Sequence, residues 1–368
     1  MPASVDLVAR CHCGRFDLPI SFPADSLPQR KAICLCDRCR HGTGSLGVVV
    51  VDLPAAPATS VLETLTLREM KGGSGRPHLR YRCSTCGAQA VGCITRPNGE
   101  QVWGVYVGLL DRTAGVLKVT GFEYCQGPGD TGVAAFLPDL PAFTGKADES
   151  PLVPNAEREA PAGAVQQTAE RLPVRCDCGS VDLVISRPTA EAEAYCYNPP
   201  ATANGSTRRR FLTTACACAS CRTTTASCLP ALAVTHVPWR DLHTVSDPTA
   251  PLGPDNGGRL LDLARIPGAV AYASSDQTTR YRCAGSCGAS LGVVTRSMPG
   301  ILKISTGLLR AAEGARAESW AFWWTGTDER ESAIPPAIHA LDEALDQELV
   351  GDWLAGLKRW GIETGLRT

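Results

Sequence analysis

The stretch Cys34-Leu-Cys36-Asp-Arg-Cys39, which opens the segment CLCDRCRHGTGS at 34–45, decides what kind of protein this is. Cysteines this close together are typical of a metal site, because their thiolates can reach a single ion. The stretch recurs as CACASCRTTTAS at 216–227, so the chain carries it twice. The repeated cluster predicts two metal-binding units in tandem.

A pair of cysteines precedes each central cluster and another pair follows it. The order is CxC, then CxCxxC, then CxxC or CxxxC, with seven cysteines per unit: Cys11, Cys13, Cys34, Cys36, Cys39, Cys83 and Cys86, then Cys176, Cys178, Cys216, Cys218, Cys221, Cys283 and Cys287. Seven thiols divide naturally into four and three. Four thiolates close a tetrahedral zinc site, whereas three leave a position open, which is the usual mark of a zinc that does chemistry.

The rest of the composition is that of a soluble intracellular protein. The chain has 368 residues, 44% of them hydrophobic, and a net charge of -1. This length suffices for about two or three domains. The balanced charge gives no reason to expect nucleic acid as a partner, and no apolar run is long enough to predict a membrane span. Without a secretory pattern at the N-terminus we expect a cytoplasmic protein, with the nucleus as an alternative. The oligomeric state is left open.

A disulfide framework in an exported protein is the second interpretation of the cysteines. Two cysteines one residue apart are poorly placed to bridge each other, and clustered cysteines inside the cell favour metal binding. The sequence therefore favours metal over disulfides. Four further cysteines lie outside the pattern, and we expect them to be small core residues or idle thiols: Cys93, Cys125, Cys196 and Cys228.

The repeat extends beyond the cysteines and indicates strands. Leu79-Arg-Tyr-Arg-Cys83 reappears as Thr279-Arg-Tyr-Arg-Cys283. Short β-branched runs bounded by Gly and Pro predict a mainly β fold, at 46–52, 101–107, 289–295 and 300–305. We place the first domain at 5–143 and the second at 171–330. A linker rich in Pro, Ala and Glu joins them at 144–170.

The last segment, 331–368, has the period of an amphipathic helix. Apolar residues recur every three or four positions, at Ile338, Leu341, Leu345, Leu349, Trp353, Leu357 and Trp360. We expect this helix to pack on the second domain, and a dimerisation helix is the alternative.

The motifs RCHCG, CLCDRCRHGTGS and YRCSTCG resemble the glutathione-dependent formaldehyde-activating enzyme family, which also includes centromere protein V. RCDCGS, CACASCRTTTAS and YRCAGSCG resemble a diverged copy. The resemblance implies an Mss4-like fold of β-sheets in each of two tandem domains. It implies two zinc ions per domain, hence up to four in the two units of the chain. It also implies a carbon–sulfur lyase, similar to S-(hydroxymethyl)glutathione synthase, that acts on glutathione or a related thiol adduct.

The same resemblance assigns roles to the cysteines. The outer pairs would form a structural site of four thiolates, Cys11, Cys13, Cys83 and Cys86 in the first unit and Cys176, Cys178, Cys283 and Cys287 in the second. The central cluster would hold a zinc with an open position, with Cys34, Cys36 and Cys39 catalytic and Cys216, Cys218 and Cys221 as their counterpart. Three thiolates give such a zinc complex a net negative charge, which suits exchange of a thiol ligand better than generation of hydroxide.

The second unit departs from the pattern in two places. Cys283 and Cys287 are one residue further apart than Cys83 and Cys86, and the glycines at 40–45 have no counterpart at 222–227. If that turn must approach a ligand closely, the second site is in doubt. We therefore expect activity in the first domain. A non-catalytic zinc scaffold that binds a protein partner is the alternative function.

Several other residues are weaker candidates, each with a simpler interpretation. His12 and His41 flank the clusters in sequence. They could act as fourth ligands or proton carriers, and the simpler interpretation is that their side chains point outward. Four arginines could bind the carboxylates of a glutathione-like substrate, or merely occupy exposed strand positions: Arg82, Arg96, Arg282 and Arg296. An aromatic group is expected in the core rather than at a substrate: Trp320, Phe322, Trp323 and Trp324.

Overall fold

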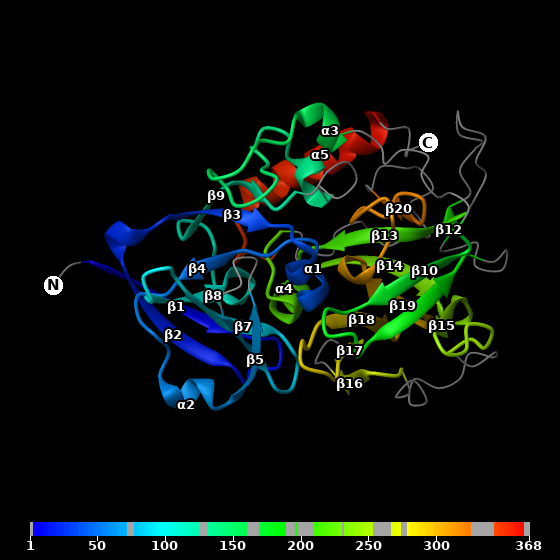
Figure 1. Cartoon of the computed structure of the whole chain (residues 1–368), viewed down its shortest axis with the longest axis horizontal. Coiled ribbons are helices and arrows are strands. Elements are labelled where there is room, and N and C mark those ends of the chain that lie inside the picture. Colours follow the sequence, from blue (N-terminus) through cyan, green and yellow to red (C-terminus); the bar gives the residue numbers. More distant parts are fainter. Residues whose placement is uncertain are drawn as a thin grey trace.

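The computed structural model describes residues 3–71, 77–125, 132–159, 169–188, 196–197, 209–229, 232–252, 266–273, 278–324 and 342–363. The fold is mainly β with a C-terminal helix, as predicted. Figure 1 shows two halves side by side, with the first in blue and cyan and the second in green to orange. The short helices α1 (Asp37–Thr43) and α4 (Ala219–Thr225) lie between them.

The first half is built from three sheets. β1 (Ser4–Arg10) pairs with β2 (Asp17–Pro23), and β3 (Gln29–Cys34) runs parallel to β9 (Leu117–Glu123). In β2 every second residue is apolar and buried, which fixes its core face. The largest sheet has the order β4-β8-β7-β6-β5, with strands Val50–Asp52, Gln101–Tyr106, Gln89–Thr95, Pro77–Cys83 and Leu65–Lys71. Helix α2 (Thr59–Leu62) precedes β5.

The second half repeats this strand order inside a larger sheet. Its strands β14-β19-β18-β17-β16 correspond in order to β4-β8-β7-β6-β5 and span Leu232–Pro238, Met298–Ser305, Ser290–Thr295, Thr278–Cys283 and Ala269–Ala273. β13 (Arg210–Cys216) extends the sheet at β14 and also pairs with β12 (Cys196–Tyr197) and with β20 (Ala321–Trp323). A separate sheet has the order β10-β11-β15, with strands Arg171–Arg175, Asp182–Ser186 and Leu242–Thr244.

The two halves contact each other through reciprocal backbone hydrogen bonds. The amide of Asp177, inside the second CxC, donates to the carbonyl of His41 at 3.0 Å. In the same way the amide of His12, inside the first CxC, donates to the carbonyl of Thr223 at 3.3 Å. Each CxC loop therefore lies against the helix that carries the other half's central cluster.

A pair of arginines makes a second reciprocal contact. Arg82 donates from Nε and Nη2 to the carbonyls of Ser286 and Gly285, both at 3.1 Å. Arg282 donates to the carbonyls of Thr85 at 2.6 Å and Ser84 at 2.8 Å. Each arginine therefore holds the loop between the last two cysteines of the opposite half.

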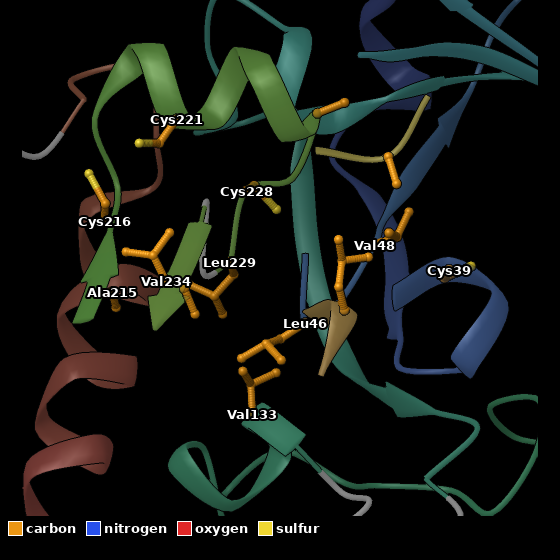
Figure 2. Close-up of a cluster of buried hydrophobic side chains, with 14 of the residues drawn as sticks. Cys39, Leu46, Val48, Val133, Ala215, Cys216, Cys221, Cys228, Leu229 and Val234 are labelled. Atoms are coloured by element: carbon orange, nitrogen blue, oxygen red, sulfur yellow. The ribbon is translucent and has the colours of Figure 1, made fainter. Parts of the chain in front are cut away.

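The hydrophobic core is continuous through both halves. One cluster of buried side chains contains residues of the first half together with residues of the second. Figure 2 shows Leu46, Val48 and Val133 of the first half in the same cluster as Leu229 and Val234 of the second. A second, small cluster belongs to the second half alone, with Leu212, Phe322 and Trp324.

The C-terminal helix α5 (Gln347–Glu363) bridges the halves instead of packing on the second alone. Trp353 and Trp360 both contact the ring of Phe136, at centroid distances of 5.7 and 5.3 Å. Phe136 belongs to the 3-10 helix η3 (Gly132–Phe136) of the first half, and it also contacts Trp323 of the second. The apolar stripe is thus buried within the chain, whereas Ile338 and Leu341 lie outside the described residues.

Part of the segment expected to be a linker is packed onto the protein. Residues 144–159 include helix α3 (Asn155–Glu159), where Arg158 is buried and donates to the carbonyls of Leu140 and Pro138 at 2.8 and 2.7 Å. Residues 160–168 lie outside the described ranges, so the domain boundaries stay a prediction. No helix in the described part of the chain is long and apolar enough to cross a membrane.

Candidate metal centres

The outer cysteine pairs of each half converge on one point. The thiols of Cys11, Cys13, Cys83 and Cys86 lie within 4.8 Å of one another, and so do those of Cys176, Cys178, Cys283 and Cys287. The closest sulfur pairs are 3.3 to 3.6 Å apart, for example 3.5 Å between Cys13 and Cys83. A tetrahedral zinc with about 2.3 Å bonds to sulfur needs about 3.8 Å between its ligands, whereas a disulfide needs about 2.05 Å. Both groups therefore fit zinc and not disulfides.

Local backbone turns hold these thiols in place. The amide of Phe16 donates to Cys11 Sγ at 3.4 Å, and the amide of Val181 donates to Cys176 Sγ at 3.3 Å. Hydrogen bonds from backbone amides stabilise thiolates. The CxC turn and the later CxxC or CxxxC turn of each half are far apart in sequence. A metal bound by both would therefore link the start of each half to its main sheet.

The central clusters sit where a strand runs directly into a helix. β3 ends at Cys34, Cys36 is the N-cap of α1, and Cys39 lies in the first turn of that helix. The amide of Cys39 donates to the carbonyl of Cys36 at 3.0 Å, which folds the chain back on itself. The three thiols lie within 4.8 Å of one another, as do those of Cys216, Cys218 and Cys221 at the junction of β13 and α4. Among the described residues, no histidine or carboxylate joins either group of three.

The first central cluster has a cation and a phenol beside it. Arg80 Nη2 donates to Cys39 Sγ at 3.3 Å. Burial would lower the pKa of Arg80, but Tyr106 and Cys39 raise it, so its guanidinium stays charged. Tyr106 is buried, burial raises its pKa, and no described residue hydrogen-bonds its hydroxyl. The pKa of Cys39 lies well below its ordinary value because Cys34 and Cys36 donate to its thiolate and Arg80 attracts it.

The end of β9 lies beside the cluster of Cys34, Cys36 and Cys39. Glu123 is the strand partner of Cys34, and burial raises the pKa of its carboxyl, with the charge of Cys39 adding to the shift. The next residue, Tyr124, has a left-handed backbone with φ of 59°. A non-glycine residue in this region is strained and is often found at functional sites. Arg80, Tyr106, Glu123 and Tyr124 were not predicted from the sequence, although Arg80 lies within the repeated Arg-Tyr-Arg-Cys motif.

The second central cluster differs in its surroundings. Arg280, the counterpart of Arg80, donates to Ser220 Oγ at 2.7 Å, and its charge acts on the thiols of Cys218 and Cys221. Ser220 in turn lies 3.4 Å from His12 Nδ1, so a residue of the first half reaches the site of the second. His12 therefore belongs to the surroundings of the opposite cluster and is not a ligand of its own.

The structure gives the other candidates different roles. His41 is buried at the interface between the halves; burial lowers its pKa to about 3, and it is therefore neutral. Arg82 and Arg282 hold backbone carbonyls of the opposite half, as described above, while Arg96 pairs with Glu100 at the surface. Arg82 and Arg282 thus lie at the groups of four thiols, and Arg96 lies at the surface, so the contacts described for these three arginines are not with the central clusters. The four aromatic residues at 320–324 are buried, which confirms their place in the core.

The glycine turn after the first cluster faces the other half and not a ligand. Gly44 ends α1 with φ of 85°, and a Cβ there would come within 2.3 Å of the carbonyl oxygen of Ser290. The matching turn in the second half has Ala226 in the same left-handed region, with φ of 58°. Here Gly108 supplies the space, since its Cβ would lie 2.2 Å from the Ala226 carbonyl carbon. The absence of a glycine at Ala226 therefore does not count against ligand binding at the second central cluster.

Residues 6–125 match the family model described as glutathione-dependent formaldehyde-activating enzyme. Over these residues the chain is similar to this family. The match includes the seven clustered cysteines of the first half and does not extend to the second half. No curated protein and no solved structure matches the chain significantly.

Proposed function

We propose that this protein is a zinc-dependent carbon–sulfur lyase that acts on glutathione or a related thiol adduct, and that the reacting site is Cys34, Cys36 and Cys39. The observation that supports this best is the combination of three clustered thiols with Arg80, which donates to one of them, and Tyr106, whose hydroxyl makes no hydrogen bond with a described residue. A site with structure as its sole role has no need of Arg80 or Tyr106 there. We also propose that the second half is a diverged copy of the first.

The residues fit zinc at both kinds of group, with up to four ions in the four groups of thiols. At the central cluster a bound zinc would supply a positively charged position for the sulfur of the substrate. The chain itself provides the charge balance. Three thiolates outweigh a divalent ion by one negative charge, and the guanidinium of Arg80 offsets that charge from beside Cys39.

Proton transfer is assigned to Glu123 and Tyr106. In the cleavage direction the carbon–sulfur bond of a hydroxymethyl thioether breaks, its electron pair stays on sulfur, and the hydroxyl proton leaves as formaldehyde forms. Burial raises the pKa of the Glu123 carboxyl, which makes it a better proton acceptor than an exposed carboxylate, so it can take up and return this proton. The hydroxyl of Tyr106 can donate a hydrogen bond to the oxygen of the adduct.

The alternative, a non-catalytic zinc scaffold, keeps both metal sites but predicts no turnover. The free thiols of the described cysteines fit a reducing compartment, so we propose the cytoplasm as the location. A small-molecule thiol is the proposed partner under the lyase function, whereas a protein is the partner under the alternative.

The test measures exchange between free formaldehyde and S-(hydroxymethyl)glutathione by two-dimensional exchange NMR with the purified full chain. We expect faster exchange with the protein than without it, and a loss of about 100-fold or more for Cys36→Ser. Cys93→Ser is the matched control, because Cys93 is buried in β7 and belongs to no group of thiols. Elemental analysis of the same samples gives the zinc content. Zinc-loaded protein without any acceleration would leave the scaffold as the better description.

A further inference from the structure

The second half contains a buried lysine with no partner. Lys303 on β19 is only 8% exposed, and its ammonium makes no hydrogen bond or ion pair with any described residue. It lies opposite His236 in β14, and His236 Nε2 is 3.1 Å from the hydroxyl of Thr214 in β13. Thr214 precedes Cys216 by two positions on the same strand, so both face the same side of the sheet. A row of polar residues therefore leads across three strands from Lys303 to the second cluster.

The first half has no such row. The register that pairs His236 with Lys303 pairs Asp52 with Gly104 in the corresponding strands. A Cβ at Gly104 would come within 2.4 Å of Val50 Cγ1, so this position has no room for a side chain. Lys303 is thus a specific feature of the second half and not a remnant of a shared site.

The two central clusters consequently differ in charge. The first has Arg80 and the carboxyl of Glu123 within electrostatic range of its thiols. The second has Arg280 near Cys218 and Cys221, and Lys303 near Cys216 and Cys221. Burying an ammonium is costly unless a negative charge lies nearby. The thiolates supply part of that charge, and the ammonium keeps its hydrogen-bond donors available for a ligand.

We propose that Cys216, Cys218 and Cys221 form a second thiol-binding site, and that Lys303 makes it selective for thiols that carry a carboxylate. The thiol sulfur binds at the metal position of the cluster, and Lys303 attracts the carboxylate. This inference rests on the metal assigned to the second cluster in the proposed function, and it does not depend on lyase activity at the first.

The test uses the full chain loaded with cobalt, whose visible absorption changes when a thiolate joins its ligands. Cys36→Ser weakens the first cluster, so that the signal comes from the second. The probes are mercaptoacetate, 2-mercaptoethanol and cysteamine, which have similar sizes and carry a negative, neutral or positive group. We expect mercaptoacetate to bind about tenfold more tightly than 2-mercaptoethanol, and cysteamine to bind most weakly.

Lys303→Met should abolish this preference while binding of 2-mercaptoethanol stays the same, and Lys303→Arg should restore it. The matched control is Lys118→Met, because Lys118 is an exposed lysine on β9. In the reciprocal protein, Cys218→Ser, the first cluster should show no preference for mercaptoacetate. An equal loss for all probes would make Lys303 a structural residue only and overturn the proposal. If Lys303→Met fails to fold, the protein that retains Lys303 still tests the proposal. Equal affinities of its second cluster for the three probes would overturn the proposal as well.

A failure of this proposal can be told from a failure of the proposed function. If the second cluster takes up no cobalt while formaldehyde exchange at the first is intact, only the second-site inference is lost. If cobalt and thiols bind at the second cluster but the protein gives no exchange, the lyase function is lost and the binding site remains.

Discussion

Replacing Arg282 by Met should loosen a metal site in the other half of the protein. Arg282 donates to the carbonyls of Thr85 and Ser84, which lie between Cys83 and Cys86, two of the proposed zinc ligands. It also donates to the carbonyl of Cys283 at 2.9 Å. Removing the guanidinium leaves these carbonyls without their donor, while the nonpolar stem of the side chain is kept.

The magnitude follows from the number and setting of these bonds. A hydrogen bond from a charged donor contributes about 1.5–3 kcal/mol. Ser84 is exposed and Thr85 is half-buried, so water can replace part of the hydrogen bonding that their carbonyls lose. Arg82 lies close enough for its charge to repel that of Arg282, and the substitution relieves this repulsion. We therefore expect a loss of about 2 kcal/mol in the free energy of unfolding, and a smaller loss for Arg82→Met, whose two bonds are longer.

The assay combines urea unfolding of the zinc-loaded protein with pulsed alkylation of its cysteines, read by mass spectrometry. In Arg282→Met, Cys83 and Cys86 should become reactive sooner than in the parent protein. Arg112→Met is the control, because Arg112 is exposed and outside the interface. If only Cys283 and Cys287 become more reactive, Arg282 does not hold the Cys83 and Cys86 thiols of the opposite half in place, and the prediction is wrong.

Three further predictions concern packing. Gly44→Ala should destabilise the protein by about 2 kcal/mol or more, because a Cβ would meet the Ser290 carbonyl at 2.3 Å and φ is 85°; thermal unfolding measures the loss. Gly356→Ala would favour an isolated helix by about 1 kcal/mol, yet here it should lower the melting temperature, because its Cβ would lie 1.5 Å from the Phe136 carbonyl oxygen. Cys228 should resist iodoacetamide at pH 8 in the native protein and react in urea, since burial raises its pKa to about 12.

The cysteine spacing was sufficient to predict the two central groups of thiols, whereas the joining of the outer pairs into groups of four was implied by the family resemblance, because those pairs are far apart in sequence. CxC, CxCxxC and CxxC are short enough that local turns bring their sulfurs together, and the structure gathers the same residues. The mainly β fold was also predictable, because the strands are short and β-branched. The role of the glycine turn at Gly44 was not predictable, since its close approach is to Ser290, a residue far away in sequence.

The side chains around the central clusters were harder to predict for the same reason. Arg80 and Arg82 are two residues apart, and simple alternation would place them on one face of β6. A register shift between Tyr81 and Arg82 lets Arg80 reach Cys39 while Arg82 reaches the other half. Tyr106 and Glu123 reach the cluster from strands that meet it only in the folded sheet, so no spacing along the chain announces them.

The reciprocal interface has a consequence for how the two sites can diverge. When a symmetric pair forms from two copies of one chain, every substitution appears in both sites at once. Here the halves belong to one polypeptide, so they always meet as unlike partners at high effective concentration. The corresponding positions Gly104 and Lys303 can therefore differ, because neither half has to associate with an identical copy of itself. Under the proposed duplication, one chain can therefore carry two unlike sites while their reciprocal contacts are kept.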